Sequence, residues 1–300
     1  MRETFFTKSE TSVKDIVFLD GISRTGKYFL GKLISGLKGI EYFQAITIIE
    51  QLPYVVRLGC MKEDAAISLI RATIGEFTYN MMMGRNLNLR FDDASSIYNS
   101  MEFNRYLGRS LSEDRDALFA SFHDEGRRPL ILVHEVLSNI GILFRAYPHL
   151  KLVNMIRHPI DIIHSWFLRG LGRRFGTDPT LVSPVIKGIN SAVPWFAYTW
   201  KEEYETISEI DRVIKCIAVL IEMGEDAYGK LSKVHKKQLL FIRYENVVEQ
   251  TDEVIRNICS FLKTEPNEYL PQIMTRERCN RELPISLREK KTEEISKIAS

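Results

Sequence analysis

The chain has 300 residues, 45% of them hydrophobic and 27% charged, a composition typical of a globular protein. It carries 41 Lys and Arg against 39 Asp and Glu, which gives a formal net charge of +2. So small a charge argues against nucleic-acid binding by overall electrostatic attraction. The amino-terminal segment is too polar for a signal peptide, and no run of about eighteen apolar residues occurs. The four cysteines form no CxxC pair. We therefore expect a cytoplasmic protein with no membrane span, no metal and no nucleic-acid partner.

The first predicted unit is a strand, a loop and a helix. The sequence DIVFLDG is a short apolar run that ends in a turn, and a helix-forming stretch follows at once. Residues 21–28 read GISRTGKY, which matches GxxxxGK but has Tyr28 where a nucleoside triphosphatase needs a Ser or Thr for magnesium. Backbone N–H groups at such a turn attract an anion, and Arg24 and Lys27 add positive charge. The sequence predicts an anion-binding loop that works without magnesium.

Two long stretches, residues 45–125 and 175–235, carry helical periodicity in pieces. We expect them to be helical insertions in a single domain that spans residues 1–300. Insertions that follow strand ends would form the walls of an acceptor pocket, because ligands of open α/β sheets bind beyond the carboxyl ends of the strands. Between the two stretches, the apolar run LILV at residues 130–133 predicts a further strand.

The next unit again has the order strand, loop, helix. Residues 150–157 form an apolar run typical of a buried parallel strand, and Pro159 suits the first turn of a helix. Arg157 at the strand end can hold an anion with two hydrogen bonds, and Ser165 adds a hydroxyl from the helix. Residues 239–244 are a fourth apolar run before a helix-competent stretch. Four such units predict an α/β fold with a parallel sheet and helices on both faces.

Taken together, these motifs resemble those of the sulfotransferases that use 3′-phosphoadenylyl sulfate (PAPS). The loop SRTGKY at residues 23–28 resembles the family pattern P-[KR]-[ST]-G-[TS]-[TS], with Lys27 and Tyr28 where the family has hydroxyl residues. Residues 239–262 are similar to the late strand, turn and helix of the family. The family pattern R-x-P-x-D-x-x-x-S, which grips the 3′-phosphate of the donor, is matched by Arg157, Pro159, Asp161 and Ser165.

The resemblance implies a P-loop NTPase-like sulfotransferase fold. It also implies an enzyme that transfers a sulfuryl group from PAPS to a hydroxyl or amine of an acceptor, leaving 3′-phosphoadenosine 5′-phosphate. Arg24 stands where the family has a Lys or Arg at the leaving phosphate oxygen, and Lys27 is a second cation for that place. The acceptor is expected to be a small molecule or a carbohydrate. The residues implied to bind the donor are Ser23, Arg24, Thr25, Gly26, Lys27, Tyr28, Arg157 and Ser165.

An acceptor hydroxyl needs a general base within hydrogen-bond reach. His134, directly after LILV, is the first candidate, since many cytosolic members of the family carry a catalytic histidine at about this place. Glu135 is the second, and Glu50 is the best candidate among the carboxylates that follow the second strand. A histidine that caps a helix or fills the core is the structural alternative for His134.

Two other functions fit part of the pattern. A magnesium-dependent P-loop kinase shares the fold, but Tyr28 lacks the metal-binding hydroxyl and a kinase has no need of Arg157 with Ser165. A non-catalytic nucleotide-binding protein with a degenerate loop is the second alternative. The basic cluster at residues 276–283 either reaches the 3′-phosphate or lies on a solvated surface. The sequence favours the sulfotransferase.

Overall fold

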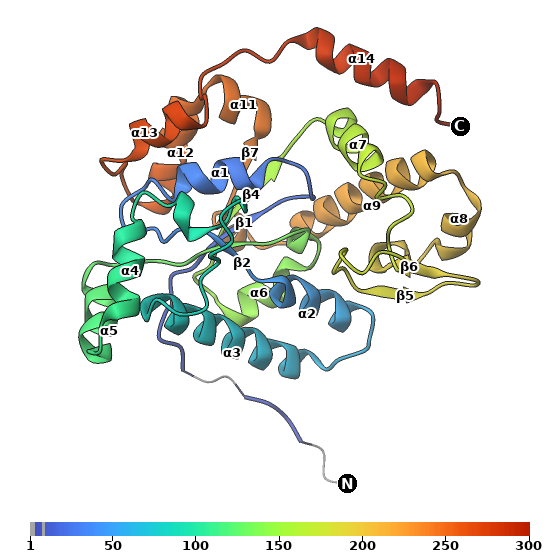
Figure 1. Ribbon diagram of the computed structural model, residues 1–300. Coiled ribbons are helices and arrows are strands. Elements are labelled where there is room, and N and C mark those ends of the chain that lie inside the picture. Colours follow the sequence, from blue (N-terminus) through green and yellow to red (C-terminus); the bar gives the residue numbers. More distant parts are fainter. Residues whose placement is uncertain (1–3, 8–9) are drawn as a thin grey trace.

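The computed structural model describes residues 4–7 and 10–300, so part of the polar amino-terminal segment lies outside it (Figure 1). Within the described residues, the central element is a five-stranded sheet in the order β2-β3-β1-β4-β7, and all neighbouring strands are parallel. The predicted α/β fold with a parallel sheet is confirmed. The short β2 is the second strand expected before Glu50, for which the sequence analysis gives no bounds. The strands are β1 (Val17–Asp20), β2 (Gln44–Ala45), β3 (Leu130–Leu132), β4 (Lys151–Ile156) and β7 (Leu239–Arg243).

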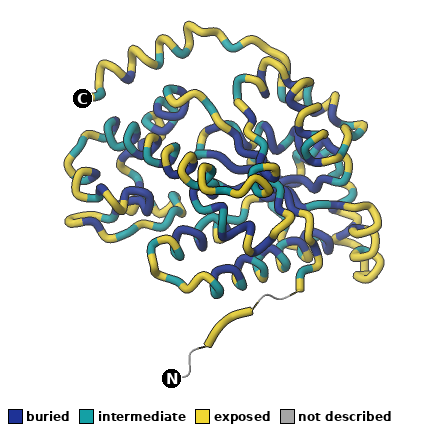
Figure 2. Tube along the Cα trace, turned by 180° about the vertical axis from the view of Figure 1, so that it is seen from behind, coloured by how far each residue is buried: buried dark blue, intermediate teal, exposed yellow. Residues whose placement is uncertain are grey.

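The sheet is buried because successive side chains of its strands enter two different apolar layers. Val17 and Leu19 of β1 pack in one layer, and Phe18 packs in the other. Leu152 and Val153 of β4 divide in the same way. Strands buried on both faces read as continuous apolar runs, which is why these segments stand out in the sequence. Figure 2 shows buried residues in dark blue gathered at the centre of the molecule.

Helices cover both faces of the sheet (Figure 1). One layer contains α1 (Lys27–Ile34), α4 (Phe103–Leu111), α11 (Tyr244–Glu249), α12 (Thr251–Leu262) and α13 (Leu270–Arg276). The other contains α2 (Thr47–Arg57), α3 (Glu63–Met82), α5 (Arg115–Asp124) and α6 (Ile140–Ala146). A third apolar cluster joins α7 (Pro159–Leu168), α8 (Lys201–Thr206) and α9 (Glu209–Gly229). The short α10 (Lys233–Lys236) precedes β7, and α14 (Ile285–Ser296) is the last helix.

The two stretches expected to be helical insertions have different contents. Residues 45–125 contain α2 to α5. Residues 175–235 contain α8, α9 and α10, and also an antiparallel hairpin of β5 (Val185–Lys187) and β6 (Ala192–Pro194) that the sequence analysis does not predict. None of the described helices is long and apolar enough to span a membrane.

The order of the strands decides where a ligand can bind. β1 lies at the centre with β3 on one side and β4 on the other. The strand order therefore reverses at β1, and the loops that follow β1, β3 and β4 all leave from the same edge of the sheet. In open α/β sheets this reversal opens a crevice at the carboxyl ends of the strands. The loop at residues 21–26, His134 and Arg157 all lie at this edge.

Candidate active site

The loop between β1 and α1 has a backbone that requires glycine at two places. Gly21 has φ of 144° and Gly26 has φ of 101°, values that residues with a side chain rarely adopt. A Cβ at Gly21 would lie 2.3 Å from the carbonyl oxygen of Met155, and one at Gly26 would lie 2.6 Å from the ring of Tyr244. The loop is therefore packed closely against β4 and α11. No side chain caps the start of α1 among the described residues, so the first N–H groups of this helix have no side-chain acceptor there.

Two partners from distant parts of the chain hold this loop. The backbone N–H of Ser23 donates to Oε1 of Glu135 at 2.8 Å. The indole N–H of Trp166 on α7 donates to the carbonyl oxygen of Ser23 at 2.9 Å. Thr25 is turned inward and its hydroxyl donates to the carbonyl oxygen of Ile22 at 2.9 Å. These contacts preorganise the loop, which lowers the cost of binding an anion there.

The two motifs that suggest phosphate binding lie against each other. Nε of Arg24 donates to Oγ of Ser165 at 3.1 Å, and the guanidinium of Arg157 donates to the carbonyl oxygen of Arg24 at 3.0 Å. The Arg157 guanidinium also lies over the ring of Tyr244, 4.3 Å from its centroid. Nε of Arg157 is buried and has no hydrogen-bond partner among the described residues. Two guanidinium groups and a hydroxyl thus meet beside the start of α1.

Arg24 lies in a strained and positively charged place. Its φ of 75° is in the left-handed region, which costs a residue with a Cβ about 1–2 kcal/mol. Partial burial lowers the pKa of its guanidinium, and the nearby charges of Arg169 and Arg157 lower it further. Backbone strain together with clustered like charges is typical of a site that is stabilised when an anion binds.

The two residues that depart from the sulfotransferase pattern face different ways. Lys27 is buried, and its ammonium group donates to the carbonyl oxygens of Gly21 and, at 3.3 Å, Ile22. Burial lowers the pKa of Lys27, an effect that the carboxylates of Glu135, Asp20 and Glu50 oppose. Tyr28 is 39% exposed and meets the ring of Phe43 edge-on, with 5.7 Å between centroids. Lys27 therefore supports the loop from inside, whereas Tyr28 lies on its outer side.

The three candidates for the general base lie in one cluster beside Lys27. The backbone N–H of His134 donates to Oε2 of Glu50 at 2.7 Å, and Nδ1 of the same histidine is 3.1 Å from that oxygen. Glu135 has φ of 55° and turns its carboxylate to the loop. Burial lowers the pKa of His134 to about 4 and raises the pKa of Glu50 to about 8. The pKa of Glu135 is also raised by burial.

Asp20 at the end of β1 is a functional neighbour that the sequence analysis misses. Its carboxylate is fully buried and accepts from the backbone N–H groups of Val136 and Leu137 at 3.1 and 2.9 Å. It also accepts from the side-chain amide of Asn154 on β4 at 3.0 Å. Asp20 therefore fixes the segment that carries His134. The sequence signal for this contact is a polar residue at the end of one apolar run, Asp20, and another inside a second run, Asn154.

The last helix lies over α7 and adds positive charge there (Figure 1). Lys291 donates to the carboxylate of Asp161, and Nε of Arg288 donates to it at 3.2 Å. Burial works against ionisation of Asp161, but the contacts of Lys291 and Arg288 and the charge of Arg157 together hold its pKa below the usual value. Asp161, which matches the acid of the sulfotransferase pattern, is thereby tied to α14.

The basic cluster at residues 276–283 divides between two surroundings. Arg276 donates to the carbonyl oxygen of Asn99 at 3.0 Å. The guanidinium of Arg281 lies over the ring of Phe29 on α1, 5.9 Å from its centroid. Arg281 is therefore the member of the cluster that lies beside α1.

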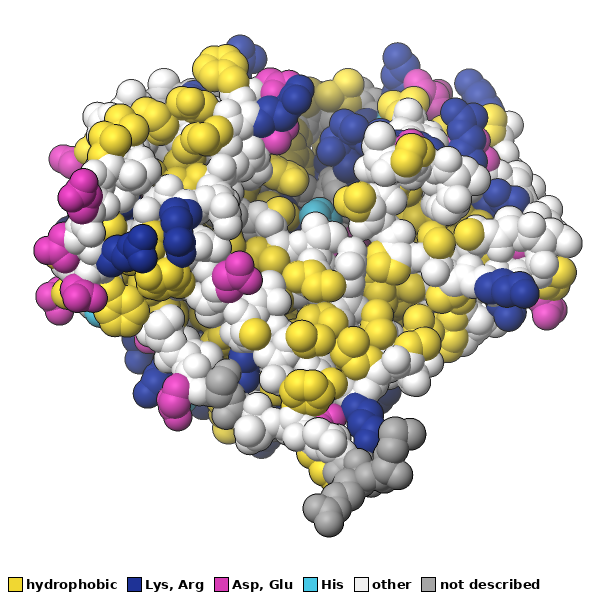
Figure 3. Space-filling model, turned by 60° about the horizontal axis from the view of Figure 1, so that its bottom comes forward, with side chains coloured by type: hydrophobic (Ala, Val, Ile, Leu, Met, Phe, Trp, Pro, Cys, Tyr) yellow, Lys and Arg dark blue, Asp and Glu magenta, His cyan; other side chains and the backbone are white. Residues whose placement is uncertain are grey.

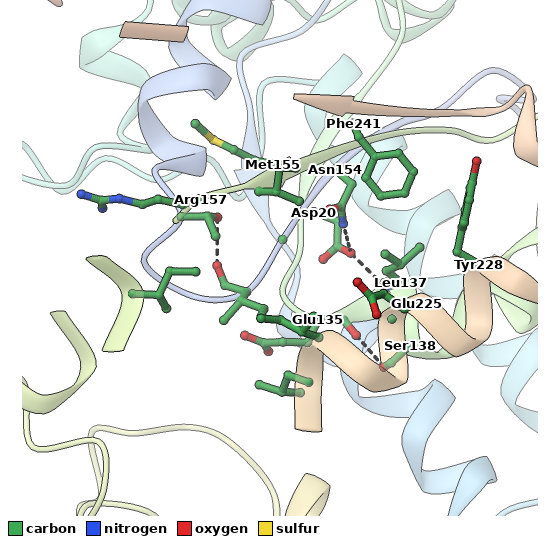
Figure 4. Close-up of a pocket in the computed structure, with 18 of the residues that line it drawn as sticks. Asp20, Glu135, Leu137, Ser138, Asn154, Met155, Arg157, Glu225, Tyr228 and Phe241 are labelled. Atoms are coloured by element: carbon green, nitrogen blue, oxygen red, sulfur yellow. Dashed lines mark hydrogen bonds between the residues drawn. The ribbon is translucent and has the colours of Figure 1, made fainter. Parts of the chain in front are cut away.

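A cavity of about 460 Å³ lies between the strand ends and α9 (Figure 4). Its walls are mostly apolar, with Leu137, Tyr228 and Phe241 among them, and Glu135 and Glu225 supply carboxylates. Arg157 contributes to one wall, but its side chain extends away from the other labelled residues (Figure 4). The cavity also reaches the loop that follows β1, because Gly21, Ile22 and Thr25 line it as well. Figure 3 shows a hollow on the surface with a histidine at its floor and Lys and Arg side chains along its rim.

The buried carboxyl of Glu50 predicts a stability change with pH. Burial raises the pKa of this carboxyl from its ordinary value of 4.5 to about 8, so between these pH values the folded state binds a proton that the unfolded state does not, and the protein loses stability as the pH rises. Glu50→Gln removes this penalty. We expect the variant to melt at least about 2 °C above the wild type at pH 9 and close to it at pH 5.

Differential scanning calorimetry at the two pH values measures this effect. Glu76→Gln, a change of an exposed carboxylate on α3, serves as the control and should alter neither melting temperature. A Glu50→Gln variant that melts below the wild type at pH 9 would contradict the prediction, because it would mean that the ionised carboxylate stabilises the fold.

Comparison with known proteins gives the class of the chain. Residues 143–284 match the family model of the sulfotransferase domain, a little under half of the chain. This match to the sulfotransferase family confirms, over these residues, the resemblance predicted from the motifs. The matched part includes Arg157, Ser165 and β7, while the loop at residues 21–28 precedes it. No curated protein matches the sequence.

Solved structures give similarities of the same kind. The sulfotransferase domain of the curacin biosynthetic pathway is 15% identical with a TM-score of 0.47, covering 90% of this chain and 81% of its own. The sulfotransferase domain of the Synechococcus PCC 7002 olefin synthase is 14% identical with a TM-score of 0.45, covering 99% of both chains. A mouse sulfotransferase complexed with PAP is 14% identical with a TM-score of 0.38, covering 89% of this chain and 66% of its own.

Proposed function

We propose that this protein transfers a sulfuryl group from PAPS to a hydroxyl or amine of a small-molecule or carbohydrate acceptor. The observation that carries the proposal is the meeting of Arg24, Arg157 and Ser165 beside the uncapped start of α1. Guanidinium groups, hydroxyls and backbone N–H groups are the donors that bind phosphate and sulfate oxygens. PAPS presents such oxygens at two places, its 5′-phosphosulfate and its 3′-phosphate.

The residues present fit a donor with two anionic ends. The glycines of the loop let the backbone approach an anion, and no side chain caps α1 among the described residues. Nε of Arg157 is buried with no acceptor in the described part of the chain, so a bound phosphate would satisfy it. We assign the 5′-phosphosulfate to the loop and Arg24, and the 3′-phosphate to Arg157 and Ser165.

The chemistry requires a cation for the leaving phosphate and a base for the acceptor. Sulfuryl transfer resembles phosphoryl transfer, in which positioning and electrostatic stabilisation supply most of the catalysis. Arg24 supplies the positive charge beside the leaving oxygen, and Lys27 fixes the loop that binds the donor. The cluster of His134, Glu135 and Glu50 supplies the base, since all three side chains can accept a proton and lie beside Lys27 at the start of α1.

Binding measurements test the donor assignment directly. Titration calorimetry with adenosine 3′,5′-bisphosphate should give a Kd in the low micromolar range or tighter. A Kd in this range corresponds to a binding free energy of about −8 kcal/mol. Adenosine 5′-phosphate lacks the group that Arg157 is proposed to hold, so it should bind at least tenfold more weakly. Equal affinity for the two nucleotides would contradict a dedicated 3′-phosphate site. A preference for ATP with magnesium over both would favour a kinase.

Sulfuryl transfer is expected to continue after removal of divalent metal. Tyr28 stands where a P-loop kinase has its magnesium-binding hydroxyl, and Arg24 supplies positive charge in place of the ion. Transfer of labelled sulfate from PAPS to a panel of hydroxyl and amine acceptors should therefore proceed at the same rate with and without EDTA. A strict magnesium requirement would overturn this part of the proposal.

A further inference from the structure

Glu50 and His134 form a partly buried pair that the proposed function leaves without separate roles. The side chains are 16% and 27% exposed, and they come from α2 and from the end of β3. One carboxylate oxygen of Glu50 contacts His134 twice, at the backbone N–H and near Nδ1. Two contacts to one residue fix both the position of the imidazole and the nitrogen that faces the carboxylate. Nε2 is then the nitrogen left to act on another molecule.

Other titratable groups face this pair from every element around it. They are Lys27 and Tyr28 of α1, Asp20 of β1, Glu135 after β3 and Tyr54 of α2. Three of them already have partners. Lys27 donates to loop carbonyls, Asp20 accepts three hydrogen bonds, and Glu135 accepts from Ser23. Glu50 is distinguished from the other two carboxylates because it contacts the imidazole.

We propose that Glu50 is a positioning residue that works through His134, so that the two side chains accept the acceptor's proton as one unit. The inference rests on the proposed sulfuryl transfer. With Glu50 ionised, its carboxylate holds the proton on Nδ1 and leaves the lone pair of Nε2 free. The acceptor O–H bond breaks and its proton moves to Nε2, while the acceptor oxygen bonds to sulfur. The bond from sulfur to the bridging oxygen breaks, and its electron pair leaves with the phosphate. Glu50 then stabilises the charged imidazole.

This arrangement gives a defined dependence on pH. When Glu50 is protonated, its O–H donates to Nδ1, the ring carries its own proton on Nε2, and no base faces the acceptor. Burial raises the pKa of Glu50 to about 8, so the active form appears as the pH rises through that value. Burial also keeps His134 uncharged over the same range, since its pKa is lowered to about 4. The imidazole therefore changes tautomer without changing its charge.

Nuclear magnetic resonance of the full chain tests the pair without any substrate. With ¹⁵N-labelled histidine, the signal of His134 is identified by its loss in His134→Gln. In the wild type, we expect a change from the Nε2–H to the Nδ1–H tautomer as the pH rises through about 8. Glu50→Gln should abolish that transition. A His134 that gains charge near pH 6.5 in both proteins would overturn the proposal.

Kinetics supply the second test and separate two kinds of failure. Glu50→Gln should lower kcat at least about tenfold and remove the rise of kcat with pH, with donor KM unchanged. Glu135→Gln should keep the rise, and Glu76→Gln should keep both rate and profile. Absence of bisphosphate binding and of transfer in the wild type would overturn the proposed function and leave the resonance result standing. Normal transfer with an unaltered pH profile in Glu50→Gln would overturn the pairing alone.

Discussion

Replacement of His134 by alanine is expected to lower the turnover number at least about a hundredfold, because a general base contributes about 10²–10⁴-fold to rate. The change removes the nitrogen that receives the acceptor's proton and leaves the loop at residues 21–28 in place. The loop is held by Glu135 and Trp166, which do not depend on the imidazole. The affinity for adenosine 3′,5′-bisphosphate should therefore stay within about twofold of the wild type.

Three measurements on the same variant separate the possible roles of His134. Steady-state kinetics give the turnover number, calorimetry gives the nucleotide affinity, and a melting curve reports the fold. A variant that melts early would assign a structural role to His134, with its ring between Glu50 and the strand end. If turnover survives in His134→Ala but collapses in Glu135→Gln, the base is the carboxylate of Glu135.

Arg157→Ala is expected to weaken binding of adenosine 3′,5′-bisphosphate by about 2 kcal/mol or more, roughly thirtyfold in Kd. The guanidinium has a buried Nε with no partner in the described part of the chain, and it lies over the ring of Tyr244. It is therefore already oriented when a phosphate arrives, and little side-chain entropy is lost on binding. Calorimetry at two salt concentrations measures the loss.

The matching control is the nucleotide rather than a second protein variant. Adenosine 5′-phosphate has no 3′-phosphate, so its affinity should change much less in Arg157→Ala. Arg157→Lys keeps the charge but not the paired donors and should fall between the wild type and the alanine variant. Equal losses for both nucleotides would mean that Arg157 acts on the loop through its bond to Arg24, and not on the 3′-phosphate.

The sequence by itself determined the strand, loop and helix units and the residue motifs at their junctions. β1, β3 and β4 are mainly apolar runs because their neighbours cover both faces, whereas β7 is an apolar run at the edge of the sheet that is only partly buried. Each run can be recognised without knowledge of the others. Pro159 begins α7 as its restricted backbone predicts. The loop glycines and the Arg157 motif are also local patterns, so they identify the class of protein from a few residues.

The tertiary structure alone decided which of these residues meet. Glu50 and His134 are 84 positions apart, and their contact depends on α2 crossing the end of β3. The ammonium group of Lys27 turns inward and donates to the loop carbonyls, and the carboxylate of Asp20 accepts from backbone N–H groups after β3. Neither contact can be recognised in the sequence. The sequence also did not predict the hairpin of β5 and β6 or the packing of α14 on α7. Periodicity reports which face of an element is buried, whereas the pairing of side chains depends on strand order and packing between segments that are distant in the chain.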